Sequence, residues 1–420
     1  MAQVRVRFST DVDAYRVIDT PFQVPMKLGR RGLSEVVNHL LGNTGADGQV
    51  AFDFTINEVL LRDSLRKFVS VHEMSTENVM VVKYFPSSSL SKDKSKKQEL
   101  PSWVGALSFD PKAAHVYAGM YDGTYELLDA SLKSAQSGGA HAAPVRAIEA
   151  LAVGQRTGFA TASKDHTVRM FSSDGALVKE GTAHLNSVES LAFLPSRNLL
   201  FSADWAGSLA CWDASILGGD AQPNKSTTGR KNLKRASMED WSPVWTTKAH
   251  TQSVSGIVED PAFVGTRLIT SSHDHTLKVW DIERQDCLRT VAGSRVVTAL
   301  AASGVGRNVG TTHPDGMVRL WDMRVQLGGG EDEGGAANGA VSVLGTVGAW
   351  MSDISFHAED GTKLATCDYE GAVQLWDLRS SRALDTKSVH DGKALCVEWG
   401  HDATLFSGGS DCCVKSTRLA

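Results

Sequence analysis

The sequence predicts a mainly β protein in which a seven-bladed β-propeller follows a small α+β domain. Three observations support this. Seven strand-like segments end in a Trp-Asp dipeptide or a degenerate copy of one, these endings recur at a regular spacing, and the first 85 residues follow a different apolar pattern. A regular repeat of this length indicates a ring or stack of similar units rather than one compact core.

The repeats set the expected number of blades. Four copies of the dipeptide are intact, at Trp212-Asp213, Trp280-Asp281, Trp321-Asp322 and Trp376-Asp377, and three are degenerate, at Leu128-Asp129, Phe171-Ser172 and Thr417-Arg418. The first residues of these pairs lie 43, 41, 68, 41, 55 and 41 positions apart. Without about 27 residues of the longest interval and about 14 of the second longest, the period becomes ~41, which is typical of WD40 repeats.

The fourth repeat carries the most complete set of polar residues. In WD40 repeats a buried network of His, Ser, Asp and Trp side chains joins the inner strands, and we expect it here at His250, Ser272, Asp274 and Trp280. Buried polar groups stabilise only when all of them are paired. Because His and Asp also recur at the repeat period elsewhere, we interpret them as structural rather than catalytic. The full set is expected in the fourth blade alone.

Residues 1–85 predict a separate domain. Alternating apolar residues indicate strands at 4–8, 15–24, 52–56, 59–61 and 79–84. Between the second and third of these, Leu33, Val36, Val37, Leu40 and Leu41 follow the spacing of an amphipathic helix that Gly42 closes. The order β-β-α-β-β-β is that of the ubiquitin-like (β-grasp) fold. The segment continues past Pro86 and has no free Gly-Gly end, so we expect it to bind rather than to be conjugated.

The remaining boundaries follow from composition. Residues 86–101 are rich in Ser and Lys and are expected to be a flexible linker, and 102–420 is the propeller. Two insertions, 214–240 and 325–340, each follow a Trp-Asp strand and are expected to be loops between blade strands. The first is basic over 225–235. It could contact RNA phosphates or form part of a nuclear import signal, or it could be an ordinary solvated loop.

The propeller needs one strand from outside its repeats. The chain ends three residues after Thr417, so the seventh blade lacks an outer strand. WD40 rings close by borrowing this strand from the sequence before the first blade, which here means the region between the linker and Trp103. Closure removes an exposed sheet edge.

Bulk properties exclude several classes of function. The net charge of −5 does not favour general nucleic-acid binding. No metalloprotease, P-loop or nucleophile-elbow motif is present, so we expect no enzyme and no cofactor. No apolar run approaches ~18 residues, the length of a membrane span. The six cysteines contain no C-x-x-C pair and are interpreted as reduced thiols of an intracellular protein.

Three stretches of the small domain resemble one known family. Residues 32–42, 52–54 and 60–65 look closely like the N-terminal domain of the WD-repeat subunit of the PeBoW complex, which acts in assembly of the large (60S) ribosomal subunit. The resemblance spans both domains, including seven blades and a long loop after the third. It implies a factor of the nucleus, in both nucleolus and nucleoplasm, that is needed for maturation of the 28S/25S and 5.8S rRNAs.

The same resemblance implies three partners. The propeller would dock onto the block-of-proliferation protein, itself a propeller protein, and through it join pescadillo. The ubiquitin-like domain would bind the MIDAS domain of midasin, an AAA ATPase that removes assembly factors from pre-60S particles. A MIDAS holds a divalent cation with one open coordination position, which a partner carboxylate fills because hard oxygen ligands suit Mg²⁺. The metal therefore belongs to the partner, and this chain alone holds none.

The residue that the resemblance assigns to this role is Glu77. The family places its ligand in a Ser-Ser-Glu-like turn before the last strand, and this turn reads Met74-Ser75-Thr76-Glu77 here. Ser75 and Thr76 are flanking contact candidates, and Glu73 and Glu58 are the nearest rivals of Glu77.

Two other functions stay open. One is a notchless-type pre-60S factor, which has the same domain pair but an eight-bladed propeller. The other is a ubiquitin-pathway adaptor whose small domain docks to the proteasome or to a ligase.

Overall fold

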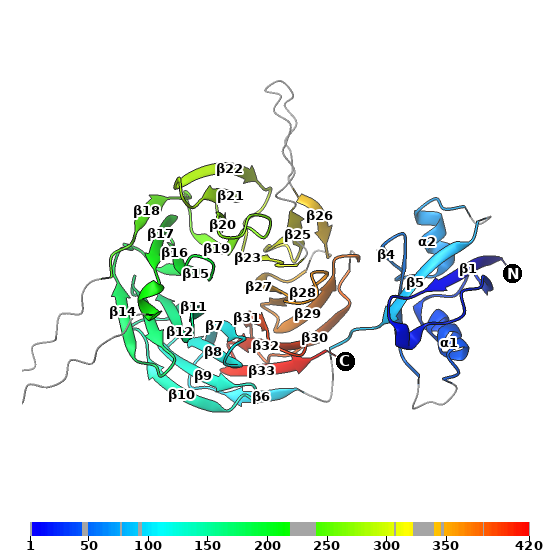
Figure 1. Cartoon of the computed structure of the whole chain (residues 1–420), viewed down its shortest axis with the longest axis horizontal. Helices are drawn as coiled ribbons and strands as arrows, with labels where there is room; N and C mark the ends of the chain where they lie inside the picture. The colour runs from blue at the N-terminus through cyan, green and yellow to red at the C-terminus, as the bar shows by residue number, and fades with distance from the viewer. Residues whose placement is uncertain are drawn as a thin grey trace, which may run out of the picture. The chain divides into compact units, whose positions relative to one another are not determined.

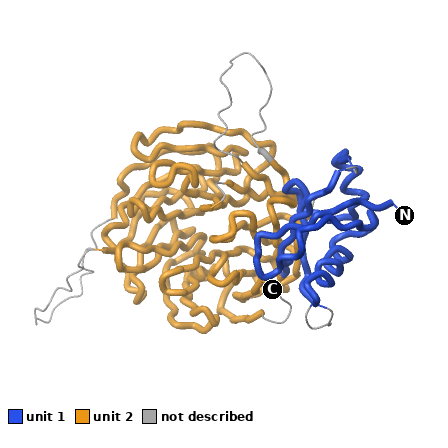
Figure 2. Tube along the Cα trace, turned by 45° about the vertical axis from the view of Figure 1, so that its right-hand side comes forward, with its two compact units in different colours: residues 1–89, 420 blue, residues 90–419 orange. Residues whose placement is uncertain are grey.

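The computed structural model describes residues 2–43, 49–75, 78–90, 95–218, 241–305, 308–321, 340–345, 348–380 and 382–419. The chain divides into two compact units, Met1–Ser89 and Leu90–Leu419 (Figure 2). The basic segment 225–235 and most of the second insertion lie outside the described residues.

The first unit is a five-stranded mixed sheet in the order β2-β1-β5-β3-β4, with two helices. Its elements are β1 Gln3–Ser9, the 3-10 helix η1 Asp13–Tyr15, β2 Phe22–Pro25, α1 Arg30–Leu40, β3 Phe52–Ile56, β4 Val59–Leu60, α2 Leu65–Val71 and β5 Met80–Pro86. Strands β1 and β5 are parallel neighbours, with Val6 opposite Met80. Alternate residues of β1 are buried, as the apolar alternation predicted.

Helix α1 packs on the sheet through apolar residues and is also hydrogen-bonded to it. Leu33 and Val37 are fully buried. Ser34 Oγ accepts a hydrogen bond from the Phe52 N–H and donates one to the Phe52 carbonyl, both at 3.1 Å. Asn38 makes the same reciprocal pair with Val50, at 2.7 and 3.0 Å. These two polar side chains therefore satisfy backbone groups of Val50, just before β3, and of Phe52, its first residue.

Helix α2 was absent from the expected β-β-α-β-β-β order, and that prediction was wrong in this respect. Ser64 caps the helix by accepting a hydrogen bond from the Lys67 N–H at 3.4 Å. Leu65, Phe68 and Val69 are its buried face. The i, i+3, i+4 spacing and the N-terminal serine are the ordinary signals of a short helix, so the sequence contained them.

In the second unit the described residues form seven four-stranded antiparallel sheets (Figure 1). The first three blades are β7 Val104–Asp110, β8 His115–Met120, β9 Thr124–Asp129 and β10 Ser134–Gly139; β11 Val145–Val153, β12 Arg156–Ser163, β13 Val168–Ser172 and β14 Leu177–Gly181; and β15 Val188–Leu194, β16 Leu199–Asp204, β17 Ser208–Asp213 and β18 Trp245–Lys248. A 3-10 helix, η3 Ser215–Gly218, follows β17.

The other four blades repeat this plan. They are β19 Val254–Glu259, β20 Arg267–Ser272, β21 Thr276–Asp281 and β22 Asp286–Ala292; β23 Ala299–Ala302, β24 Val309–Thr312, β25 Val318–Trp321 and β26 Ala340–Leu344; β27 Met351–Phe356, β28 Lys363–Asp368, β29 Ala372–Asp377 and β30 Asp385–Ser388; and β31 Ala394–Trp399, β32 Thr404–Gly409, β33 Cys413–Arg418 and β6 Lys96–Glu99. Both insertions lie between the third and fourth strands of their blades, as expected.

The ring closes through seven apolar clusters, one between each pair of neighbouring blades. Leu151 and Trp212, for example, belong to the cluster between the second and third blades. Val104 and Phe406 belong to the cluster between the first and the seventh. The propeller therefore has no single central core. Its stability depends on each blade packing against two neighbours, including the first against the last.

Strand β6 is the borrowed outer strand of the seventh blade. It pairs antiparallel with β33, with Glu99 opposite Cys413 and Lys96 opposite Ser416. The prediction of borrowed closure is confirmed. The expectation of a flexible linker over 86–101 was wrong for this segment, because Lys96–Glu99 supplies the ladder partner that β33 needs. Residues 91–94 lie outside the described residues.

Candidate functional site

The network predicted for the fourth blade forms, with one change of residue. His250 Nδ1 lies 3.0 Å from Asp274 Oδ2, and His250 Nε2 lies 2.8 Å from Thr270 Oγ1. The Trp280 indole N–H donates to the same Thr270 oxygen at 2.9 Å. Ser272, the hydroxyl expected in this place, instead accepts a hydrogen bond from the Asp274 N–H and donates to the Gln252 carbonyl. Thr270 is therefore the residue that joins the His to the Trp.

The third blade contains the same four-membered network, so the expectation of a single complete set was wrong. His184 contacts Ser202 at 2.7 Å and Asp204 at 3.2 Å, and the Trp212 indole donates to Ser202 at 2.7 Å. The carboxylate comes from Asp204, which ends the second strand, rather than from the turn position that Ala206 occupies. The position equivalent to Asp274, six residues before the Trp, is Ala206 here, so the sequence did not indicate this carboxylate.

The hydroxyl is the most regular member of the network. It stands ten residues before the Trp position in six blades, as Thr161, Ser202, Thr270, Thr311, Thr366 and Ser407. Each of these side chains is buried. Burial lowers the pKa of His250 and His390 and so favours the neutral imidazole, which accepts a hydrogen bond at one ring nitrogen and donates one from the other. This arrangement holds strands together and leaves no free acid or base.

Changing Thr270 to Val is expected to lower the free energy of unfolding by about 2 kcal/mol, because His250 and Trp280 would lose a shared partner while the side-chain shape is kept. Thermal or denaturant unfolding of the full chain measures this. Thr246→Val, at an exposed position of β18, is the matched control and should change stability little. Equal stability of the two variants would contradict the role given to Thr270.

One face of the propeller carries a set of exposed aromatic side chains. We define the mouth face as the one where the first strand of each blade begins and the second ends. Five aromatic residues stand directly before a first strand or directly after a second strand, namely Trp103, Tyr121, Trp205, Trp350 and Tyr369. Trp205 is the most exposed, at 55%, whereas Tyr121 is half-buried. Exposed large aromatic side chains gathered on one face are typical of protein-binding surfaces.

The aromatic residues pair within blades. The Tyr121 N–H donates to the Trp103 carbonyl at 3.0 Å, and the two rings lie 5.7 Å apart. The equivalent pair in the sixth blade is Tyr369 and Trp350, whose rings are stacked at 5.9 Å. The backbone hydrogen bond holds each pair of rings in this arrangement, so the aromatic surface is preorganised.

Cationic side chains lie over two of these rings. The Arg146 guanidinium lies 5.6 Å from the centre of the Tyr121 ring, and Lys393 Nζ lies 4.5 Å from that of Tyr369. Arg146 also forms a 2.8 Å ion pair with Glu189. Arg146 and Glu189 lie at the β-bulges at the starts of β11 and β15, where the extra residue changes the direction of a side chain.

Residues of the first three blades line a pocket of about 510 Å³ on the mouth face. Its lining consists of Tyr121, Pro144, Arg146, Lys164, Asn186, Ser187, Glu189 and Trp205, from the first three blades. Such a pocket, with an aromatic wall and a positive side chain, suits an anchoring side chain of a partner protein. The sequence contained a signal for it, because an aromatic residue stands seven positions before the Trp position at Tyr121, Trp205 and Tyr369.

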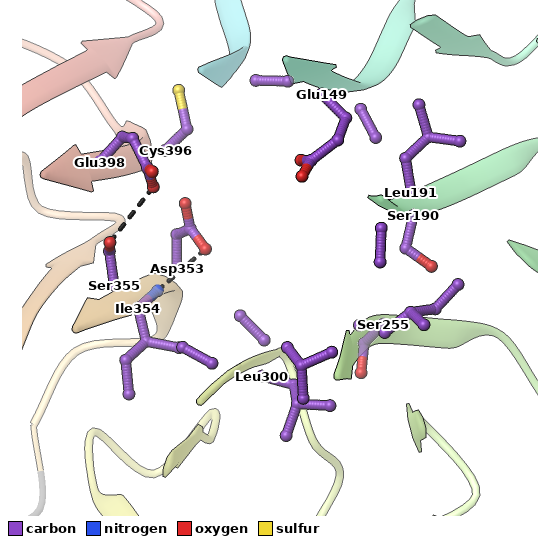
Figure 3. Close-up of a pocket in the computed structure, with 18 of the residues that line it drawn as sticks. Glu149, Ser190, Leu191, Ser255, Leu300, Asp353, Ile354, Ser355, Cys396 and Glu398 are labelled. Atoms are coloured by element: carbon purple, nitrogen blue, oxygen red, sulfur yellow. Dashed lines mark hydrogen bonds between the residues drawn. The ribbon is translucent and has the colours of Figure 1, made fainter. Parts of the chain in front are cut away.

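The central channel is a second cavity of about 610 Å³, lined by the innermost strands, and it shares Arg146 and Glu189 with the mouth-face pocket. Figure 3 shows Glu149 at one side of the opening and Asp353 and Glu398 at the other. Ser355 donates a 3.2 Å hydrogen bond to Glu398. Burial raises the pKa of Glu149 and of Asp353 to about 7, and burial with repulsion from those two carboxylates raises the pKa of Glu398 to about 8.

Glu398→Gln is expected to raise the melting temperature by about 2–4 °C at pH 8.5 and to leave it unchanged at pH 4. The folded-state pKa lies above the ordinary value of 4.5, so the folded chain binds the extra proton and this carboxyl destabilises the fold increasingly as pH rises from 4.5 to 8. Gln removes that penalty and can still accept from Ser355. Exposed Glu359→Gln is the control for thermal scans at both pH values. A gain at pH 4 would contradict the explanation.

The metal ligand predicted for the small domain is Glu77. Glu77 and its neighbour Thr76 are outside the described residues, and Ser75 is exposed. The two rivals are described. Glu58 is exposed in the turn between β3 and β4, and Glu73 is exposed after α2. Both have a positive φ, of 67° and 48°, so the backbone is in the left-handed region at each.

Within the described ranges, no group of three or more His, Cys, Asp or Glu side chains is arranged to hold a metal ion. None of the helices that the structure places has both the length and the apolar character needed to cross a bilayer.

Comparison with known proteins matches both units. Residues 4–69 match the NLE (NUC135) domain, and residues 175–213 and 241–281 match the WD domain, G-beta repeat. The chain is 29% identical to "Ribosome biogenesis protein WDR12 homolog" of Nematostella vectensis, over 97% of each chain. It is 28% identical to the protein of that name from Chlamydomonas reinhardtii, over 98% of this chain and 96% of the relative. The protein of the same name from Oryza sativa subsp. japonica is also 28% identical.

The chain is therefore a WD40-repeat protein with an N-terminal NLE domain, and neither matching family is a catalytic one. Over nearly its full length it is similar to proteins named ribosome biogenesis protein WDR12 homolog. The family resemblance inferred from residues 32–42, 52–54 and 60–65 is confirmed.

Proposed function

We propose that this protein is a non-enzymatic assembly factor of the large ribosomal subunit, acting in the nucleus at the nucleolus and in the nucleoplasm. One observation carries the proposal: its relatives, matched across both units and nearly end to end, are named ribosome biogenesis proteins. The role is that of a scaffold needed for 28S/25S and 5.8S rRNA maturation. Any contact of residues 225–235 with rRNA would add to binding through phosphate charge alone.

The propeller is the scaffolding part. We assign the mouth face to the block-of-proliferation protein, through which pescadillo joins the complex. Trp205 and the pocket beside it supply the exposed aromatic surface and the buried anchoring site that strong protein interfaces have. The seven four-stranded sheets of the second unit favour this complex over the eight-bladed notchless type.

The NLE domain is the part that the AAA ATPase midasin would bind. We assign Glu77 the role of completing the coordination of Mg²⁺ in the MIDAS domain of midasin, with Ser75 and Thr76 beside it. A carboxylate that coordinates a metal makes a directional contact that can bear a load. Midasin would then pull on the NLE domain, and the propeller would carry its partner away from the pre-60S particle.

Affinity purification of the tagged full chain from nuclear extract tests the proposed function. We expect pescadillo, the block-of-proliferation protein and large-subunit precursors among the recovered proteins. A Trp205→Ala chain should lose the first two, whereas Leu288→Ala, an exposed change on the outer strand β22, should keep them. Recovery of proteasome or ligase subunits without ribosomal precursors would support the adaptor function instead.

A further inference from the structure

The chain leaves the first unit only a few residues before the strand that closes the ring, β6 Lys96–Glu99. Ser87 is the last residue hydrogen-bonded within the first unit, where its N–H donates to the Ala51 carbonyl at 2.7 Å and its hydroxyl accepts from Arg30. Leu90 begins the second unit. Only Ser88 and Ser89 separate them, so a load on the NLE domain reaches the propeller at Leu90.

Leu90 is an anchor on the propeller. Its side chain is only 3% exposed and belongs to the apolar cluster between the sixth and seventh blades. Its N–H donates to Asp385 Oδ2 at 2.9 Å, and it forms an isolated bridge with Leu419. It thus contacts an outer strand of the sixth blade and the end of the seventh.

Strand β6 has much less to hold it. The side chains of Lys96, Lys97 and Glu99 are exposed, so the strand buries almost no apolar surface and is held by its backbone pairing with β33. Its other end is fixed at Leu100, which is 8% exposed and whose N–H donates to the Cys412 carbonyl at 2.8 Å. In every other blade a hairpin or insertion joins the outer strand to the third strand of the same blade, whereas β6 comes from a distant part of the chain.

The chain beyond Leu100 leads straight into the mouth face. Trp103 follows three residues later, and its carbonyl accepts the hydrogen bond from Tyr121 that fixes the aromatic pair. A displacement that passes along β6 to Leu100 therefore arrives at one wall of the docking surface.

We propose that Leu90 and β6 form a tension-sensitive clasp that couples the NLE domain to the mouth face. Traction on the NLE domain loads Leu90 first. When Leu90 leaves its site, the load passes to the Lys96 end of β6, whose residue pairs with β33 then part in turn toward Glu99. Release of β6 loosens the Trp103–Tyr121 pair, so that pulling weakens the docking surface at the moment of removal. That midasin supplies the traction rests on the proposed function, whereas the existence of the clasp does not.

Single-molecule pulling of the full chain tests the clasp without any partner. Handles are attached at Glu73→Cys, on the exposed surface of the NLE domain, and at the exposed native Cys287 of the fourth blade. We expect a first opening event of about ten residues, or roughly 35 Å of chain. Leu90→Ala should lower the force of this event by at least a third, and Leu209→Ala, which truncates a fully buried leucine away from the clasp, should not. Equal forces in all three chains, or a first event as long as a whole blade, would overturn the proposal.

Hydrogen exchange of the same three chains without load tests the coupling. In Leu90→Ala the amides of β6 and the Tyr121 amide should exchange at least tenfold faster than in the unaltered chain, while the pairing of β32 with β33 stays protected. Faster exchange in β6 with an unchanged Tyr121 amide would remove the link to the mouth face. Faster exchange throughout the propeller would show that Leu90 only stabilises the fold.

Discussion

A propeller that begins at Leu100 is expected to melt on the order of 10 °C below one that begins at Ser87. The shorter chain loses Leu90 from the cluster between the sixth and seventh blades, and burial of a leucine contributes about 1.5–3 kcal/mol. It also loses the four residue pairs between β6 and β33, whose hydrogen bonds contribute about 0.5–1.5 kcal/mol each. Their sum is near 5 kcal/mol, and about 1 kcal/mol shifts the melting point by ~2–4 °C in large domains.

The comparison has an internal control. The chain that begins at Ser87 lacks the whole NLE domain but keeps the closing strand, so its propeller transition should match that of the full chain in calorimetry. A synthetic peptide of residues 87–99 should restore part of the lost melting temperature of the shorter chain, because it binds only the folded ring. The same peptide with Leu90→Ala should restore less. If both truncated propellers melt together, β6 does not contribute to closure.

Loss of the strand should also change solubility. Strand β33 would become an unpaired edge over Cys413–Arg418, and such an edge is a template for pairing with other chains. Natural sheets protect edges by covering them, and β6 is the cover here. Aggregation of the shorter chain before it melts would therefore agree with the same physical cause.

The ring was predictable because repetition makes its signal redundant. Each repeat ends in the same kind of dipeptide, so degenerate endings such as Thr417-Arg418 could still be assigned from their spacing. The small domain was predictable in most of its strands, where apolar alternation was clear, but the second strand, expected over 15–24, covers only Phe22–Pro25. Helix α2 was missed because seven residues hold only two turns of helical spacing. A short helix gives a weak periodic signal against the surrounding strands.

The predictions that were wrong in the propeller concern contacts between neighbouring strands. Ser272 and Thr270 both follow the alternation of β20, so the sequence could not decide which hydroxyl meets Trp280 across the hairpin. Asp204 replaces a turn carboxylate with one from a strand end, a substitution that only the geometry of His184 explains. The composition of 86–101 indicated a solvated tether, yet exposed lysines are also what a natural edge strand carries, and this hid β6.

The docking surface was signalled only in part by the sequence, through the aromatic residues at Tyr121, Trp205 and Tyr369. Trp103 and Trp350 are far apart in the chain. Their local sequence does not indicate that residues directly before a first strand and residues directly after a second strand lie on the same face. The propeller topology brings them together with Tyr121 and Tyr369. A binding surface on a propeller therefore consists of residues at equivalent positions of different blades. Such a surface can be recognised only from the three-dimensional arrangement of the blades.

Changing Glu77 to Ala is expected to reduce binding of the full chain to an isolated midasin MIDAS domain by at least a hundredfold, or roughly 3 kcal/mol. The proposed bond is between a hard carboxylate oxygen and Mg²⁺, and alanine leaves that coordination position to water. Asp keeps the carboxylate but shortens the side chain by one methylene, so Glu77→Asp should bind measurably, yet more weakly than the unaltered chain.

The exposed rivals supply matched controls for this measurement. Glu58→Ala and Glu73→Ala each remove one surface carboxylate of the same domain, and both should bind the MIDAS domain within about threefold of the unaltered chain, since long-range charge effects at the surface are small. Circular dichroism checks that each variant is folded, and EDTA should abolish binding wherever it occurs. If Glu77→Ala binds as tightly as the unaltered chain while EDTA still abolishes the complex, the ligand is another carboxylate, and the variant of Glu58 or Glu73 that loses binding identifies it.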